Sequence, residues 1–179
     1  MKVRKIIFGG IIAALYVALT YAIIPLAYTP IQFRLSEVLT ILPFYFPLAV
    51  PGLFVGCIIA NLLSPYGWLD MVVGSSASLI AALCTMWIGM KFRRDSINAK
   101  ICACFPPVIF NAIFIGAMIA YFMVGSGEAD AYWAAFIVNG LQVGAGQFAV
   151  LYIIGLPLMV YLPKTDIIDR LQNIYTGGR

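Results

Sequence analysis

The 179-residue sequence contains no histidine, and only 10% of its residues are charged. Histidine is the commonest general base and the commonest metal ligand in proteins, so its absence removes the usual basis for an acid–base or metal enzyme. The sequence also has no G-x-x-x-x-G-K-[ST] run, the usual phosphate-binding loop for ATP. We therefore expect a protein that is not an enzyme, has no cofactor of its own and cannot consume ATP by itself.

Cysteine is present but does not suggest a metal site. The four cysteines lie within or at the ends of apolar stretches, where a free thiol behaves as a small hydrophobic side chain. Cys102 and Cys104 are two residues apart and would point to nearly opposite faces of a helix. We predict no metal site at any of the four, Cys57, Cys84, Cys102 and Cys104.

Apolar residues make up 63% of the sequence, well above the roughly one half found in soluble domains. Uninterrupted apolar stretches at 6–28, 71–90 and 101–125 reach the roughly 20 residues that cross a bilayer as a helix. The fold class is therefore expected to be all-α and integral to a membrane.

The basic residues predict the number of crossings. They gather at 2–5, 91–100 and 164–179, with only Arg34 elsewhere. Cytoplasmic loops carry an excess of Lys and Arg, so an even number of spans should separate the first two clusters. The proline-containing segment 37–64 is then a hairpin of two short helices that turns near Pro47–Gly52.

Two further stretches, 101–125 and 132–162, complete the expected topology. We predict a six-transmembrane-helix bundle with both termini in the cytoplasm. Residues 1–163 would form the membrane domain, and 164–179 a cytoplasmic amphipathic tail on the membrane surface.

Polar and aromatic residues concentrate in the predicted outer half. A charge or amide at membrane depth costs up to about 3 kcal/mol on insertion scales, so such groups tend to face the bundle interior and to be functional. Aromatic rings beside amides and carboxylates suit a flat heterocycle, which stacks on its faces and forms hydrogen bonds at its edge. The candidate binding residues are Arg34, Glu37, Asn61, Tyr66, Trp68, Asp70, Trp133, Asn139 and Gln142.

Each candidate also has a structural interpretation. Arg34 and Glu37, three residues apart, can simply pair with each other, and Asp70 can cap the helix that follows. Asn61 and Asn139 can bridge helices. The aromatic residues can belong to the belt that lines any membrane interface.

Small residues at intervals of four form one stripe along the first span: Gly10, Ala14, Ala18 and Ala22. Such stripes let a second helix approach closely. The stripe can arise by chance, because alanine is common in membrane helices, or it can pack against another helix of this chain. If it instead meets a helix of a partner, Gly10, Ala14 and Ala18 are docking residues.

Several short runs together resemble a known family. They are Gln32-Phe33-Arg34-Leu35-Ser36-Glu37, Gly52-Leu53, Gly56-Cys57, Ala60-Asn61-Leu62, Ser64-Pro65, and Asp70 with Gly74-Ser75. Over about residues 5–163 the sequence resembles the queuosine-precursor transporter (QueT) family, the substrate-binding S components of energy-coupling-factor (ECF) importers.

The resemblance implies a function and a set of partners. S components have six helices with both ends in the cytoplasm, and an A-x-x-x-A motif in the first helix, matched here by Ala14 and Ala18, contacts a transmembrane coupling subunit. Two ATPase subunits complete the complex. The implied substrate is a deazaguanine base, either the cyano or aminomethyl precursor or queuine, taken up across a bacterial plasma membrane.

The alternatives are an S component for another vitamin-like molecule, a small stand-alone transporter or a membrane enzyme. No partner among nucleic acids is expected, because the basic residues lie in short clusters beside apolar spans.

Overall fold

The computed structural model describes residues 2–29 and 31–176, and within these ranges it contains helices and turns but no strand. The chain begins with α1 (Lys2–Ala22) and the short α2 (Ile24–Ala27), separated at Ile23 just before Pro25. Proline has no backbone N–H and clashes with the preceding turn, so an α-helix does not continue smoothly through it. The remaining elements are η1 (Leu35–Phe44), α3 (Ala49–Ala60), η2 (Asn61–Leu63), α4 (Trp68–Lys91), α5 (Ile97–Ala103), α6 (Phe105–Gly125), α7 (Tyr132–Phe148), η3 (Ala149–Gly155), α8 (Leu156–Tyr161), η4 (Leu162–Lys164) and α9 (Ile167–Thr176).

Four apolar helical segments are long enough to cross a membrane: Val3–Ala22, Trp68–Lys91, Ile97–Gly125 and Tyr132–Lys164. The last runs through α7, a π-helical segment η3, and α8. At a rise of 1.5 Å per residue, about 20 residues match the roughly 30 Å hydrocarbon core. The expectation of an all-helical fold is confirmed.

The segment between the first two long helices forms a hairpin of two shorter elements, η1 and α3. At one end Phe46 packs edge-to-face on Phe8, and toward the other end the Thr20 hydroxyl donates to Ser36, so η1 runs antiparallel to α1. Gly52 lies against Gly9, and the Tyr21 hydroxyl donates to the Ile59 carbonyl. The helix α3 is therefore parallel to α1.

The hairpin turns earlier than the sequence predicts. Its turn lies at Tyr45–Leu48, whereas Pro51 and Gly52 belong to the first turn of α3. A proline is tolerated in the first turn of a helix, where its missing N–H has no intrahelical acceptor. Gly52 is needed there for a different reason, because a Cβ would lie 2.6 Å from the Gly9 carbonyl oxygen.

The first element of the hairpin is a ten-residue 3₁₀-helix. Such runs rarely exceed four residues, and their side chains at i and i+3 eclipse one another. Glu37 and Thr40 accordingly share a buried face, where the Thr40 hydroxyl donates to the Glu37 carbonyl at 2.6 Å. This geometry places the Glu37 side chain inside the bundle.

The central helix α4 packs against α3, η1 and α6. Its buried surface consists largely of small residues, which allow close helix contacts in a membrane. Glycines serve the same purpose where α6 meets α7, because a Cβ on Gly116 would lie 2.6 Å from the Gly140 Cα. The close packing holds the polar side chains of η1, α4 and α6 near one another.

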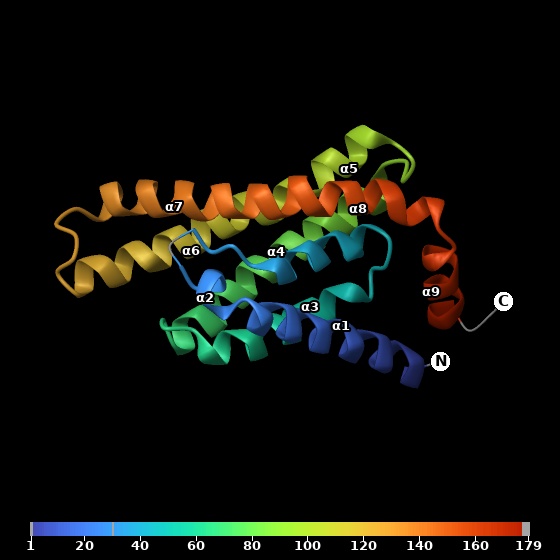
Figure 1. The fold of residues 1–179 in the computed structure, drawn as a ribbon, viewed down its shortest axis with the longest axis horizontal. Helices are drawn as coiled ribbons and strands as arrows, with labels where there is room; N and C mark the ends of the chain where they lie inside the picture. Colours follow the sequence, from blue (N-terminus) through green and yellow to red (C-terminus); the bar gives the residue numbers. More distant parts are fainter. Residues whose placement is uncertain (1, 30, 177–179) are drawn as a thin grey trace.

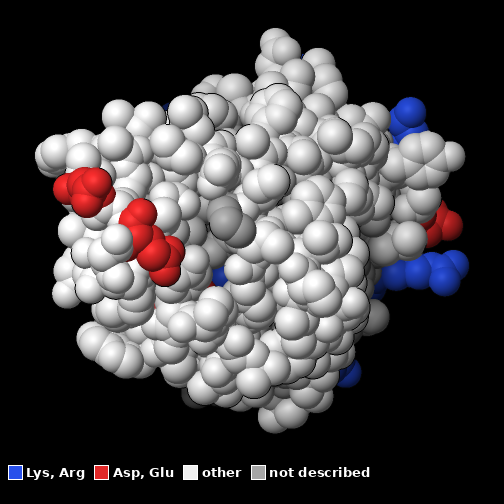
Figure 2. All heavy atoms as spheres, turned by 60° about the vertical axis from the view of Figure 1, so that its left-hand side comes forward, with Lys and Arg blue, Asp and Glu red and all other residues white. Residues whose placement is uncertain are grey.

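Both described ends of the chain lie at the same end of the molecule, as does the α4–α5 connection (Figure 1). The α6–α7 loop lies at the opposite end. Figure 2 shows acidic side chains at the α6–α7 end and most of the visible basic side chains at the other. The predicted tail 164–179 contains α9, whose Ile168 and Leu171 pack on the larger of two hydrophobic core clusters; residues 177–179 lie outside the described residues.

Candidate binding site

The interior contains two groups of buried polar side chains. One is built around Arg34 and Asp70, and the other around Glu37. These three charged residues are at most 3% exposed. Buried charges require partners, so the bonds that each one makes indicate its role.

Arg34 donates hydrogen bonds to three other segments of the chain. It precedes η1 in an extended conformation, which directs its side chain back toward α2 and α4. Its Nε donates to the Ala27 carbonyl at 3.2 Å, one terminal nitrogen donates to Asn61 Oδ1 at 3.0 Å, and the other to Asp70 Oδ2 at 3.1 Å. The guanidinium also lies 5.0 Å from the centre of the Tyr28 ring. This is the geometry of a structural cation that joins three segments.

Asp70 has one occupied and one free oxygen. Its Oδ2 accepts from Arg34 and from the Ser64 hydroxyl at 2.6 Å. Its Oδ1 is buried without a hydrogen-bond partner in the described part of the chain. A Cβ on Gly74 would lie 2.6 Å from this oxygen, 2.7 Å from Asn61 Nδ2 and 3.5 Å from Ile115 Cδ1, so Oδ1 lies in the region where α4 meets both Asn61 and α6.

The structure decides between the interpretations of three candidates. Arg34 pairs with Asp70, and its side-chain hydrogen bonds go to Ala27, Asn61 and Asp70, so a simple pair with Glu37 is wrong. Asp70 lies inside the first turn of α4, whose N-cap is Gly67, so it is not the capping residue, but a carboxylate in this turn does complement the helix dipole as that interpretation expects. Asn61 does bridge segments, because it accepts from Arg34 and its Nδ2 donates to the Asp70 carbonyl at 2.9 Å.

Glu37 is held by neutral donors. The Tyr16 hydroxyl of α1 donates to its Oε1, and Asn111 Nδ2 of α6 donates to its Oε2 at 3.3 Å. An ionised carboxylate has about four acceptor positions, so each oxygen retains capacity for one more donor. Glu37 is thus a buried carboxylate whose hydrogen-bond partners are uncharged and which can accept from a ligand.

The comparisons with known proteins address the family directly. A model of the family described as "QueT transporter" matches residues 6–164. A curated relative, "Queuosine precursor transporter QueT" of Lactococcus lactis subsp. cremoris (strain MG1363), is 30% identical over 155 residues, which cover 85% of this chain and 88% of the relative. The chain belongs to the QueT transporter family. No solved structure matches the chain.

Membership in the QueT family confirms the resemblance and the transport role. Both the family and the relative are transporters, so the expectation that the protein is not an enzyme is also confirmed. The matched residues include every candidate for binding and docking, and the four long apolar helices fit a multi-pass membrane protein.

Several candidates of this QueT-family chain lie apart from the buried polar groups. Trp68 and Trp133 are 69% and 71% exposed, as expected of an interfacial aromatic belt. Gln142 is half-buried on α7. Asn139 is buried, and its amide donates to the Ala135 carbonyl at 2.8 Å in its own helix and to Met123 Sδ of α6 at 3.2 Å, so it bridges α6 and α7 as the structural interpretation expects. The structure therefore joins Arg34, Asn61 and Asp70 in one group, places Glu37 in the other, and leaves these four outside both.

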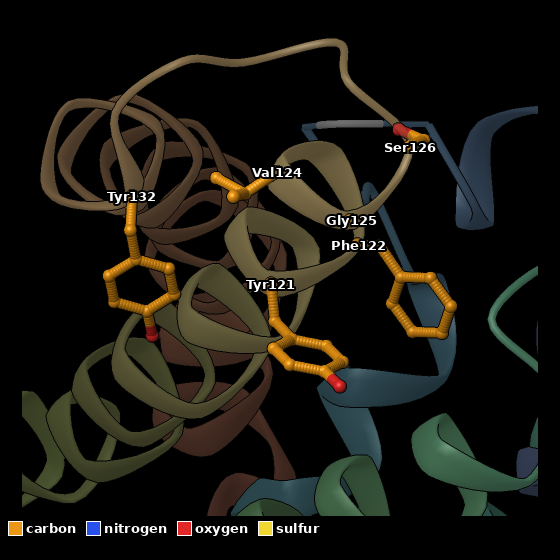
Figure 3. A pocket seen from close by; sticks show the side chains of 6 residues that line it. All are labelled: Tyr121, Phe122, Val124, Gly125, Ser126 and Tyr132. Atoms are coloured by element: carbon orange, nitrogen blue, oxygen red, sulfur yellow. The ribbon is translucent and has the colours of Figure 1, made fainter.

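Tyr66 belongs to an aromatic region at the α6–α7 end. Its ring packs on Phe122, with centroids 5.2 Å apart. A pocket of about 440 Å³ lies beside Phe122 and is lined by Tyr121, Phe122, Val124, Gly125, Ser126 and Tyr132 (Figure 3). In Figure 3 the three aromatic side chains come from the last turns of α6 and the start of α7. The pocket is apolar and separate from the two buried polar groups.

Sequence reasoning missed both hydrogen-bond partners of Glu37. Asn111 has a detectable signal, since it is an amide within the apolar helix α6, and amides inside membrane helices tend to be functional. Tyr16 has no comparable signal, because tyrosine is common in apolar spans. Both residues are buried, at 4% and 0% exposure.

The stripe of small residues on α1 faces away from the protein. Gly10, Ala14 and Ala18 are exposed, whereas Ile12 and Tyr16 on the opposite face are buried. Internal packing of the stripe, one of the interpretations drawn from the sequence, is therefore wrong. Beside Gly10, an apolar groove of about 410 Å³ runs between α1 and α3.

Proposed function

We propose that this QueT-family chain is the S component of an ECF-type importer and that it captures a queuosine precursor of the deazaguanine type. The observation that carries the proposal is the buried Glu37 carboxylate, which accepts from Tyr16 and Asn111 and retains capacity for further donors among the apolar helices of a transporter. In the other polar group, Asp70 Oδ1 is buried without a partner in the described part of the chain.

The chemistry of a guanine-like edge fits this set of groups. Such an edge presents two N–H donors beside a carbonyl acceptor. A carboxylate accepts two parallel donors, and an amide such as Asn111 can donate to the carbonyl. Glu37 suits the first role because its present partners are neutral, whereas Asp70 Oδ2 already accepts from Arg34 and Ser64.

A direct test compares Glu37→Gln with the wild type. We expect the amide variant to bind the aminomethyl deazaguanine base about 30- to 150-fold more weakly, because one ligand donor loses an ionic acceptor, at a cost of about 2–3 kcal/mol. Equilibrium binding to the purified protein measures the change. Glu128→Gln is the matched control, because Glu128 is exposed in the α6–α7 loop.

Two outcomes would contradict the proposal. If the wild type binds no deazaguanine base, the assigned substrate class is wrong, and mass spectrometry of a co-purifying heterocycle would identify the right one. If Glu37→Gln binds the base as tightly as the wild type, Glu37 is not part of the site.

The proposed topology has six membrane segments with both termini in the cytoplasm. In support, η1 runs antiparallel and α3 parallel to α1, as a membrane hairpin requires. The exposed basic residues of the α4–α5 connection lie at the same end as the described termini, in keeping with the positive-inside rule (Figure 1). The substrate would then enter from the α6–α7 end.

Cysteine labelling tests this topology. In a background with the four native cysteines replaced, a cysteine at Ser96 should react with an impermeant reagent only from inside, and one at Gly127 only from outside. Labelling of Ser96 from outside would rule out the hairpin as a double crossing. A third label at Gly178 would report the C-terminus, which lies outside the described residues.

The proposed partners are a transmembrane coupling subunit and two ATPase subunits, which would supply the energy that this chain has no motif to supply. The exposed stripe at Gly10, Ala14 and Ala18 supports a docking face on α1, because small residues let a partner helix approach closely.

A further inference from the structure

Two buried glutamines outside the predicted site have polar atoms without partners. Gln32 and Gln147 are each 1% exposed. Gln32 Nε2 and Gln147 Oε1 form no hydrogen bond in the described part of the chain. A buried polar atom without a partner is costly and rare in native proteins, so these two require an explanation.

The chain brings the two glutamines into the same region. A Cβ added to Gly146 would collide with the carbonyl oxygen of Ile31, so the segment before η1 lies directly against α7. Gln32 follows Ile31, and Gln147 follows Gly146. Two segments more than 100 positions apart in the sequence thus each place a buried amide beside this contact.

The backbone departs from regular geometry at Gln32 and just beyond Gln147. Gln32 has φ of 48°, in the left-handed region that side-chain-bearing residues rarely adopt. On the other segment, the π-helical turn η3 begins at Ala149, two residues after Gln147. Strained residues and π-helical turns both cluster at functional sites.

The glutamines also lie close to the level of Glu37 in the bundle. Ala112 on α6 contacts Gly144 on α7, which sets Asn111 within one helical turn of the level of Gln147. Asn111 in turn donates to Glu37. The two glutamines therefore lie within about one helical turn of the level of Asn111, the residue that donates to the carboxylate assigned to the ligand.

We propose that Gln32 and Gln147 form an amide pair that binds the polar edge of the transported base. Gln32 Nε2 donates to a ring nitrogen or carbonyl of the ligand, and Gln147 Oε1 accepts from a ligand N–H. This inference rests on the proposed function and adds two residues to its binding site.

The test uses Gln32→Met and Gln147→Met, since methionine keeps the length and flexibility of glutamine but has no amide. Two quantities are measured on each purified protein: the thermal unfolding midpoint without ligand and the affinity for the aminomethyl deazaguanine base. We expect each variant to bind the base about 10- to 100-fold more weakly. The unfolding midpoint without ligand should stay the same or rise, because the substitution removes the desolvation free energy that a buried amide without a partner costs the folded state. Gln172→Met in α9, outside every proposed binding residue, is the matched control and should leave the affinity for the base unchanged.

The outcomes separate this inference from the proposed function. Absence of binding to the wild type would overturn the proposed function and, with it, the ligand assigned to the amide pair. Binding by the wild type together with unchanged affinity in both variants would overturn the amide pair alone. A lower midpoint without ligand would also overturn it, since the amides would then support the fold itself.

Discussion

Replacing Arg34 by methionine should lower the free energy of unfolding by about 3–5 kcal/mol, because the substitution leaves the Asp70 carboxylate as an uncompensated buried charge. Asp70 is 0% exposed, and its ionic partner is Arg34 at 3.1 Å. The same substitution removes donors from Asn61 and from the Ala27 carbonyl. Reversible unfolding in detergent or a thermal midpoint measures the loss.

Two further variants isolate the cause. Adding Asp70→Asn to Arg34→Met removes the unpaired charge and should restore a large part of the lost stability. Arg93→Met breaks a second ion pair among the described residues, Arg93–Asp95, which is 2.8 Å long but has side chains 85% and 69% exposed. Solvent screens such a pair, so this control should leave the midpoint nearly unchanged. Equal effects of Arg34→Met and Arg93→Met would show that the buried pair is not structural.

The helical segments were largely predictable from hydropathy and charge. Long apolar runs identify α1, α4, α6 and α7 directly, because a bilayer requires about 20 apolar residues. Predicting the hairpin required the distribution of Lys and Arg, because its two elements are too short and too rich in proline to be detected in a hydropathy window. The predicted position of its turn was wrong because a proline can follow the end of one helix or lie in the first turn of the next. The packing of Gly52 on Gly9 shows that Pro51 and Gly52 belong to the first turn of α3.

The buried polar residues were predicted by type but not by pairing. Sequence spacing left open a pair between Arg34 and Glu37, whereas the Arg34 side chain instead reaches Asp70, 36 positions away. Tyr16 and Asn111 reach Glu37 only through the packing of α1 and α6 on η1. Contacts of this kind depend on tertiary structure, which periodicity and composition do not determine.

The exposed tryptophans illustrate a different limit. Trp68 and Trp133 lie at helix ends, where an interfacial belt and a ligand-stacking residue have the same sequence signature. Their exposure favours the belt. Gln32 and Gln147 have no sequence signature of this kind. Their buried amide atoms without partners can be recognised only in the folded structure.

Introducing tryptophan at Ala14 or Ala18 should abolish uptake of the deazaguanine base in cells that carry the coupling and ATPase subunits. Both alanines are exposed, so the isolated chain can accommodate a large ring without repacking. A partner helix at van der Waals distance cannot, because a bulky side chain keeps the two backbones apart. Binding of the base to the purified chain should persist, since the inward face of α1 still presents Tyr16 to Glu37.

The matched control is Ala145→Trp, the same substitution at an exposed position on α7. It should leave both uptake and binding intact, because α7 carries no proposed docking face. Co-purification of the coupling subunit with each variant links any loss of uptake to lost assembly. Normal uptake by Ala14→Trp and Ala18→Trp would show that the partner docks elsewhere. Loss of base binding in the purified variants would instead mean that the stripe supports the site through α1, because Tyr16 lies on the same helix and holds the Glu37 carboxylate.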